Sequence, residues 1–175
     1  KLMNQYHIAG EYKETTSYGT EVFLAKDGVL IGAVVIADTL KDDAKSAIAS
    51  LKAQKLHTVM LTGDSESAAN AIAEETGIDE VYSKLLPDEK LLKLQEQRTK
   101  HGAVMFVGDG INDAPVLAGA DCGVAMGSGA DAAIEAADVV FMTSSVEAIP
   151  QAIAIGKKAS RIAWQNVVFA LVVKA

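Results

Sequence analysis

The side chains of this sequence that could do chemistry gather in two glycine-bearing loops. The first loop, Gly108-Asp109-Gly110-Ile111-Asn112-Asp113, places two carboxylates and an amide side by side, directly after an apolar run. Such oxygen ligands suit Mg²⁺, which binds one or two carboxylates and shares the oxygens of a phosphate. A turn that merely caps the next helix would need only one of these side chains. The pattern therefore favours a magnesium site at Asp109 and Asp113.

The second loop, Thr62-Gly63-Asp64-Ser65, lies between an apolar run and a helical pattern. A hydroxyl, a glycine and the free N–H groups of a helix start together form a cradle for an anion. The alternative is a simple helix cap, because Asp64 and Ser65 are both good capping residues. Both interpretations stay open at this point.

Lys90 follows Pro87-Asp88-Glu89 in the first turn of a predicted helix. A cation at that end opposes the helix dipole unless it meets an anion. It is either a solvated surface lysine or a phosphate contact, and its position between the two loops in the chain makes the second role as well supported as the first. A hydroxyl, an ammonium and a magnesium-binding carboxylate are the groups that stabilise a phosphoryl group in transfer.

The nucleophile of such a reaction is harder to find. Asp38, at the end of an apolar run, is the one nearby candidate. Thr39, Leu40 and Lys41 follow it, whereas an aspartate that accepts a phosphoryl group usually has a small polar neighbour that positions the phosphate. We therefore expect Asp38 to be a cap or hinge.

Apolar runs and helical spacing alternate along the chain, which predicts a parallel sheet with helices on both faces. Continuous apolar runs such as 30–37 suit strands that are buried on both faces. Ligands bind at the carboxyl edge of such sheets, where Asp38, Thr62 and Asp109 would all lie. The expected strands are 20–25, 30–37, 57–61, 81–82, 103–107, 122–125 and 139–142, and the expected helices are 42–54, 65–76, 87–99, 112–117 and from about 145 onward.

Composition excludes several classes of protein. The net charge is −7, which argues against a nucleic-acid groove because phosphate backbones need a basic face. The single cysteine, Cys122, excludes a disulfide framework and cysteine-pair metal sites in this stretch. His7, His57 and His101 are scattered without the spacing of metal ligands.

The C-terminal segment has two interpretations. An apolar run from about Ile162 lasts about a dozen residues, against roughly 20 needed to cross a bilayer. It is either an amphipathic helix that packs on the domain or the start of a membrane helix. Lys157, Lys158 and Arg161 precede it and would keep that flank cytoplasmic.

Three motifs together resemble the P-type cation-transporting ATPases: Thr62-Gly63-Asp64, Pro87-Asp88-Glu89-Lys90 and the stretch from Gly108 to Pro115. The resemblance covers nearly the whole chain. It implies a haloacid-dehalogenase-like three-layer α/β fold with a mostly parallel sheet and a C-terminal helix entering the membrane. It also implies three parts: 1–37 as the end of a nucleotide-binding domain and its linker, 38–150 as a partial phosphorylation domain, and 151–175 as an amphipathic helix that becomes the truncated start of a transmembrane helix.

The same resemblance assigns roles to residues. Asp109 would hold the catalytic Mg²⁺ together with Asp113, while Asn112 helps to shape the site. Thr62 and Lys90 would contact the phosphoryl group of ATP or of the phosphoenzyme, with Gly63 and Asp64 in the same loop. Asp38 would be the hinge between nucleotide-binding and phosphorylation domains. The phosphorylated Asp-Lys-Thr-Gly-Thr segment does not occur in this sequence, so the chain by itself is expected to be inactive.

The stretch 124–138 looks like the heavy-metal branch of that family. Asn166 and Lys174 have a spacing that resembles the zinc, cadmium and lead exporters, in which a membrane lysine lies at the ion site; the alternative for Lys174 is a lysine that snorkels to a helix end. The resemblance thus implies an ATP-driven efflux pump in the cell membrane, with this segment mostly cytoplasmic. Its partners would be ATP, a divalent heavy-metal ion and the bilayer, without nucleic acid. A free-standing haloacid-dehalogenase-like phosphatase and a non-catalytic phosphate-binding module are the alternatives.

Overall fold

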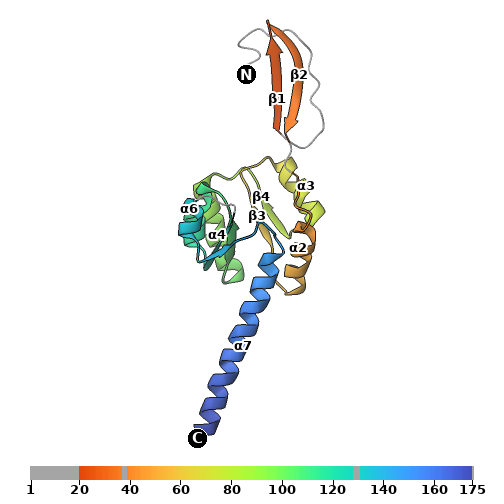
Figure 1. The fold of residues 1–175 in the computed structure, drawn as a ribbon. Helices are drawn as coiled ribbons and strands as arrows, with labels where there is room; N and C mark the ends of the chain where they lie inside the picture. Colours follow the sequence, from red (N-terminus) through yellow and green to blue (C-terminus); the bar gives the residue numbers. More distant parts are fainter. Residues whose placement is uncertain (1–19, 37–38, 128–130, 175) are drawn as a thin grey trace. The chain divides into compact units, whose positions relative to one another are not determined.

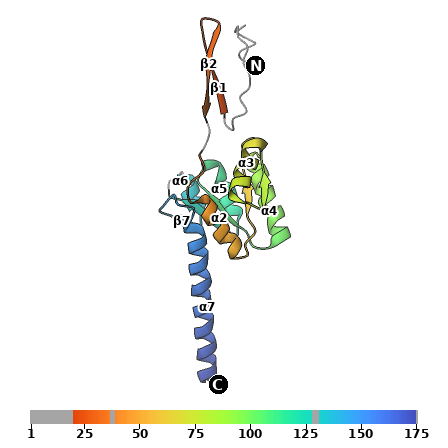
Figure 2. The same cartoon turned by 90° about the vertical axis from the view of Figure 1, so that its right-hand side faces the viewer.

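The computed structural model describes residues 20–36, 39–127 and 131–174. The chain divides into two compact units, 1–40 and 41–175. Figures 1 and 2 show the elements of each unit from two directions.

The first unit is a β-hairpin in the part that is described. Strand β1 (Thr20–Lys26) pairs antiparallel with β2 (Val29–Ile36). The connecting Asp27 and Gly28 both have positive φ angles, 52° and 80°, as the tight two-residue turns of hairpins require.

This hairpin corrects one sequence-based expectation. The run 30–37 was expected to form a strand buried on both faces within the parallel sheet. Instead β2 is antiparallel, and Val29 and Ile31 are 52% and 59% exposed. The reason is that β1 is the only strand paired with β2 among the described residues. Asp38 therefore does not follow a strand of the parallel sheet, and Asp38 itself lies outside the described residues.

The second unit contains the expected parallel strands. Strand β3 (Val59–Leu61) pairs with β4 (Glu80–Tyr82), while β5 (Met105–Gly108), β6 (Cys122–Met126) and β7 (Val139–Phe141) form a second set. Both sets are parallel throughout, which confirms the parallel α/β architecture.

The two sets differ in how deeply their strands are buried. Strand β6 has a neighbour on each side, and its Val124 and Ala125 are fully buried. Strands β3 and β5 are each paired on one side only among the described strands, and β3 is half-buried along its whole length. Each therefore keeps one strand edge unpaired in the described structure.

The helices of the second unit begin and end close to the predicted positions. They are α2 (Ala44–Ala53), α3 (Glu66–Thr76), α4 (Pro87–His101), α5 (Ala114–Gly119), α6 (Asp131–Ala136) and α7 (Ala148–Lys174), with a 3₁₀ turn over Ile111–Asp113. Helix α5 packs against α4, α6 and β6, and its Val116 and Leu117 are completely buried. With Leu94 of α4 they form the centre of the core. Helix α6 was not expected from the sequence.

Helix α7 is 27 residues long, and only its first turns pack on the rest of the unit. Gln54, the C-cap of α2, donates a hydrogen bond to the carbonyl oxygen of Pro150, 3.0 Å away, and Ile149 and Pro150 are buried. From Ala154 to Lys174 every residue is exposed, so of the two interpretations of the apolar run, the one in which it packs on this domain is wrong for the described structure. None of the described helices combines the length and apolarity needed to cross a bilayer.

Candidate functional site

The first loop follows β3, whose short apolar sequence ends at Leu61. Thr62 continues the strand pairing, because its N–H donates to the carbonyl of Tyr82 at 2.9 Å. Its hydroxyl then donates to Asp64 Oδ2 at 2.7 Å and accepts from the Asp64 N–H at 3.1 Å. Asp64 therefore fixes the direction of the Thr62 hydroxyl.

The cap of α3 is a different residue of this loop. Ser65 is the N-cap, and its hydroxyl accepts from the N–H of Ala68 at 3.4 Å. Thr62 and Asp64 are thus not used to cap the helix. The simple-cap interpretation accounts for Ser65 but leaves the threonine and the aspartate without that role.

A neighbouring segment, Lys84-Leu85, supports the loop from β4. The N–H of Lys84 donates to the carbonyl of Asp64 at 2.9 Å, and the N–H of Leu85 donates to the carbonyl of Thr62 at 3.0 Å. Lys84 has φ 57°, a left-handed conformation that costs about 1–2 kcal/mol for a side chain other than glycine. That turn aims two successive N–H groups at the loop. Sequence reasoning did not find this role of Lys84, because nothing in the residue type indicates it.

Helix α4 starts directly after this support and carries Lys90 in its first turns. The side chain of Glu89 accepts a hydrogen bond from the N–H of Leu86 at 2.8 Å, which caps the N-terminus of the helix. Lys90 Nζ lies 2.8 Å from Asp113 Oδ1, and the two side chains are only 16% and 14% exposed. The cation at the helix start has therefore met an anion, as the sequence required.

The Lys90–Asp113 pair joins helix α4 to the loop after β5. Lys90 belongs to the helix that continues from the support of the Thr62 loop, and Asp113 ends the loop after β5. A lysine ammonium has three donors, so the bond to Asp113 leaves two for an anionic ligand.

Glycine at position 108 is required by Asp113. A Cβ at Gly108 would lie 2.9 Å from Asp113 Cβ and 3.0 Å from Asp113 Oδ2, closer than real side chains approach. At Gly110 the same test gives 3.4 Å to Asp113 Oδ2. The loop backbone therefore packs tightly against the carboxylate that binds Lys90.

Asp109 and Asn112 are exposed, and neither makes a hydrogen bond or ion pair with the described residues. The Asp109 carboxylate oxygens are free, which is the donor chemistry that Mg²⁺ needs. Asp113 Oδ1 is already bound to Lys90, so Asp113 has one oxygen left for a cation. The residues present thus fit a magnesium ion at Asp109, with Asp113 as a partial ligand.

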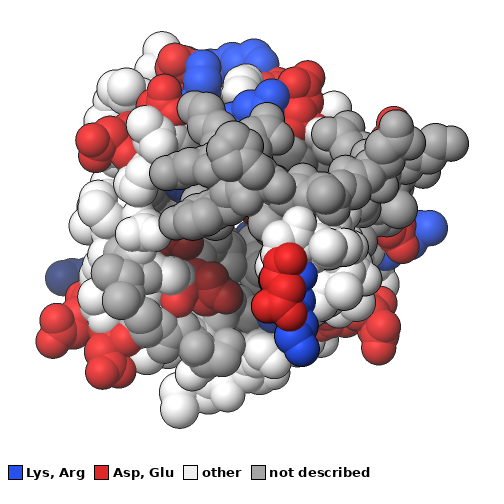
Figure 3. Space-filling view, turned by 90° about the horizontal axis from the view of Figure 1, so that it is seen from above, with Lys and Arg blue, Asp and Glu red and all other residues white. Residues whose placement is uncertain are grey.

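Two predicted residues, Asn166 and Lys174, are exposed on α7 and make no hydrogen bond or ion pair with the described residues of this site. Asp38 lies outside the described residues. On the face in Figure 3, the described Lys and Arg side chains are interspersed with Asp and Glu.

Comparison with known proteins places this geometry in a family. The family of haloacid dehalogenase-like hydrolases matches residues 2–121. A cadmium, zinc and cobalt-transporting ATPase of Bacillus subtilis (strain 168) is 48% identical over 180 residues, which is 100% of this chain and 25% of that protein. A copper-exporting P-type ATPase of Staphylococcus haemolyticus (strain JCSC1435) is 45% identical over 96% of this chain and 21% of its own length.

A solved structure supports the same grouping. The crystal structure of a zinc-transporting PIB-type ATPase in the E2·Pi state matches with a TM-score of 0.78 and 36% identity, over 97% of this chain and 26% of that one. The chain thus spans about a quarter of the length of the relatives it matches. This chain therefore belongs to the haloacid dehalogenase-like hydrolase family, and within it the chain is similar to the metal-transporting P-type ATPases.

Proposed function

We propose that this chain is the part of a heavy-metal efflux ATPase that carries the magnesium- and phosphate-binding half of the phosphorylation site. The observation that carries the proposal is the largely buried Lys90–Asp113 pair, which ties the lysine helix to the loop of Asp109. Similarity to metal-transporting ATPases along the whole chain supports it. In the intact protein, ATP would phosphorylate an aspartate outside this sequence, and hydrolysis of that phosphoenzyme would complete the cycle.

In this proposal each side chain has one task at the phosphoryl group. Lys90 offers its two remaining N–H donors to the phosphoryl oxygens, and Asp113 keeps the ammonium in place. Thr62 offers its hydroxyl, which must exchange its bond to Asp64 for a bond to a phosphoryl oxygen. Gly63 leaves space for that approach, while Asn112 shapes the rim of the Asp109 loop. Such fixed donors stabilise charge that spreads over the transferring oxygens.

Asp109 would hold the Mg²⁺ that accompanies ATP, with the second oxygen of Asp113 next to it. When bound, this ion neutralises negative charge on the phosphoryl oxygens. The carboxylate fits the task because it is exposed and makes no ion pair with any described residue.

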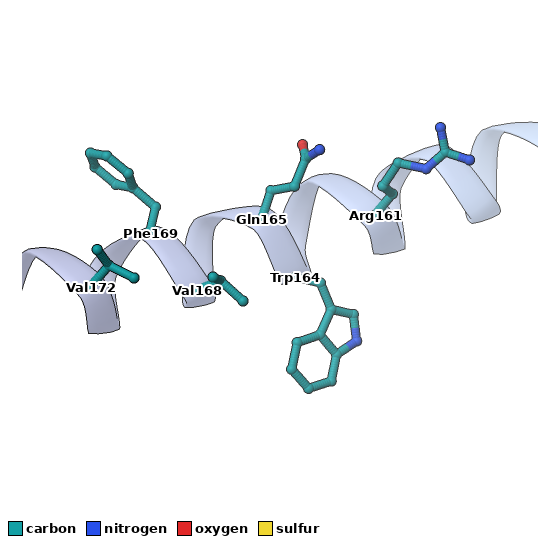
Figure 4. A pocket seen from close by; sticks show the side chains of 6 residues that line it. All are labelled: Arg161, Trp164, Gln165, Val168, Phe169 and Val172. Carbon is teal, nitrogen blue, oxygen red and sulfur yellow. The ribbon is translucent and has the colours of Figure 1, made fainter.

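The distal part of α7 would approach the membrane. The six side chains labelled in Figure 4, among them Trp164, Phe169 and Val172, all belong to this helix, and all six residues are exposed. Exposed apolar side chains in such number indicate a surface that is covered in the whole protein. We assign that cover to the bilayer, with Asn166 and Lys174 near the path of a divalent heavy-metal ion and the phosphorylation domain on the cytoplasmic side.

The division into 1–37, 38–150 and 151–175, with Asp38 as the hinge, is part of this proposal. It makes the first segment the end of a nucleotide-binding domain. Exchange of Asp38 for Ala in the full-length protein would then slow phosphoenzyme formation at low ATP without abolishing it.

The test of the proposed function is phosphoenzyme formation in the full-length protein. Asp109→Ala is expected to abolish labelling by radioactive ATP, whereas Asp42→Ala, which changes another exposed carboxylate, should label normally. Labelling should increase with Zn²⁺ or Cd²⁺ in the wild type. Normal labelling of Asp109→Ala would refute the magnesium role, and labelling that no heavy-metal ion affects would refute the cargo.

A further inference from the structure

Three side chains that are far apart in the sequence meet at the amino ends of β3 and β4. His57 precedes β3, Glu80 begins β4 and His101 ends α4. His57 Nε2 lies 3.1 Å from Glu80 Oε1, and His101 Nε2 lies 3.9 Å from the same oxygen. The imidazole rings stack with their centroids 4.4 Å apart. One ligand atom from each side chain lies within 4.8 Å of the other two.

These distances are close to those of a metal centre. In a tetrahedral zinc-type site the ligand atoms lie about 2.0–2.2 Å from the ion, and therefore about 3.4 Å from one another. The two contacts to Glu80 lie on either side of that value. The imidazole planes stack within 23° of parallel, so at least one ring must turn out of the stack before the lone pairs of both nitrogens can point at one ion.

Glu80 is already held in the orientation that such a site needs. Its Oε2 accepts from the Tyr82 hydroxyl at 2.9 Å and from Gln97 Nε2 at 3.1 Å. These two donors hold the carboxylate from the side of Oε2. The other oxygen, Oε1, is the one that faces both histidines.

His57 has a second carboxylate behind it. Asp79 Oδ2 lies 3.7 Å from His57 Nδ1, and it is held by the N–H and the hydroxyl of Thr58 at 3.0 and 2.7 Å. A carboxylate behind one ring nitrogen orients the ring and directs the other nitrogen to a metal. With Nδ1 facing Asp79, Nε2 faces Glu80, and a cation or a proton must lie between that nitrogen and the carboxylate.

We propose that His57, Glu80 and His101 bind one divalent transition-metal ion of the zinc and cobalt class, with water completing the coordination. Imidazole and carboxylate are ligands that such ions accept. The metal would fasten β3, β4 and α4 to one another.

This metal site is separate from the proposed magnesium site. His57 and Thr62 are five positions apart along an extended segment, and Lys90 and His101 are eleven positions apart along α4. Each separation corresponds to about 16 Å. The two sites therefore lie at opposite ends of β3 and α4.

Lys100 makes the proposal sharply testable. Its Nζ lies 2.6 Å from Glu80 Oε1, which is where the ion would bind. The side chain is 56% exposed and can leave for solvent, but the ion must displace it. Removal of this lysine should therefore tighten metal binding, whereas removal of a ligand should weaken it.

The experiment is a Co²⁺ titration of the complete chain, followed by the visible absorption of the ion, with Mg²⁺ in excess to occupy the Asp109 loop. One Co²⁺ per chain is expected, displaced by Zn²⁺. His57→Ala, His101→Ala and Glu80→Gln should each weaken binding at least about tenfold. Lys100→Gln should tighten it about threefold or more, and Glu74→Gln, an exposed carboxylate on α3, should bind like the wild type.

Two results would overturn the proposal. One is a His57→Ala/His101→Ala double variant that binds Co²⁺ as tightly as the wild type. Both proteins keep His7, so equal binding would place the ion at His7 or at other residues. The other is unchanged or weaker binding in Lys100→Gln. Because Lys100 is at the surface, this second variant should stay folded and decides the matter even if the histidine variants unfold.

Discussion

The exchange of Lys90 for a neutral side chain isolates the contact between α4 and the Asp109 loop. Lys90→Met leaves Asp113 as a largely buried, unpaired carboxylate, and we expect the free energy of unfolding to fall by about 1–3 kcal/mol. Urea denaturation measures this. The matched control is Lys93→Met on the same helix, whose partner Glu96 is exposed, and its cost should stay below about 1 kcal/mol. Equal losses in the two variants would mean that the Lys90–Asp113 pair does not hold α4 to the Asp109 loop.

Two glycines of the site should respond differently to the same substitution. A Cβ at position 108 would collide with Asp113, whereas at position 63 it would lie 3.4 Å from the carbonyl oxygen of Leu85, an ordinary contact. Gly108→Ala should therefore destabilise the chain by about 1–3 kcal/mol. Gly63→Ala should melt within a few degrees of the wild type.

Gly63 would then be needed for function and not for stability, because it leaves space for the phosphoryl group to approach the loop. In the full-length protein we expect Gly63→Ala to lower phosphoenzyme formation while the fold is retained, as judged by circular dichroism and radioactive labelling of the same preparation. A Gly63→Ala protein that is phosphorylated at the normal level would remove this loop from the site.

At the scale of elements, the carboxyl groups at the amino ends of β3 and β4 should make the free energy of unfolding depend on pH. Lys100, Tyr82 and Gln97 lower the pKa of Glu80 from 4.5 to about 2. A carboxyl group whose pKa is lower in the folded state stabilises it above the unfolded pKa, and that contribution is lost as pH falls toward 2. Unfolding midpoints in urea should fall between pH 5 and pH 3.

Glu80→Gln should reduce the slope of that pH dependence, and Glu74→Gln should leave it unchanged. The other carboxyl groups with a lowered pKa, such as Asp79 and Asp121, stay in both variants and contribute equally. If the wild type and Glu80→Gln lose stability in parallel, the interactions of Glu80 do not stabilise this end of the domain.

The elements that the sequence predicts correctly are those whose signals lie within or next to the element itself. Helix α3 was predicted because its signals are local: Ser65 caps its start, and Gly77 ends it with a positive φ of 79°. Strand β2 was assigned to the wrong sheet, because an apolar run shows that a strand forms but not which strand pairs with it. Helix α6 was missed although α5, which also has six residues, was predicted. Helix α5 has a proline in its first turn, a local start signal that α6 lacks.

The candidate site was likewise predicted where its signals are local and missed where it depends on tertiary contacts. Its residue types were visible in the two loops, since glycines and carboxylates after apolar runs are local features. The contact between Lys90 and Asp113 and the support from Lys84 depend on tertiary packing. The meeting of His57 with His101 contradicts the expectation of scattered histidines, because strand and helix bring together residues whose spacing carries no signal.

At the scale of the whole molecule, the two parallel strand sets bear on the aspartate that would be phosphorylated. Strands β3 and β5 precede the two loops, and each has one unpaired edge among the described strands. The sequence also contains no Asp-Lys-Thr-Gly-Thr segment. We therefore predict that this chain alone is not phosphorylated by ATP. An acid-stable, hydroxylamine-sensitive label on the isolated chain would contradict this, because it would require an aspartate of this chain as the nucleophile.

The central claim is that the Thr62 loop and the Asp109 loop form a single site. Paramagnetic Mn²⁺ in place of Mg²⁺ tests it directly, because it broadens the NMR signals of nearby amides. We predict that low Mn²⁺ broadens residues 108–113 first and residues 62–64 together with Lys90 next, and that Asp109→Asn removes the broadening of both loops. Sharp signals from 62–64 while 108–113 broaden would show that the loops do not share a ligand, and would contradict the account.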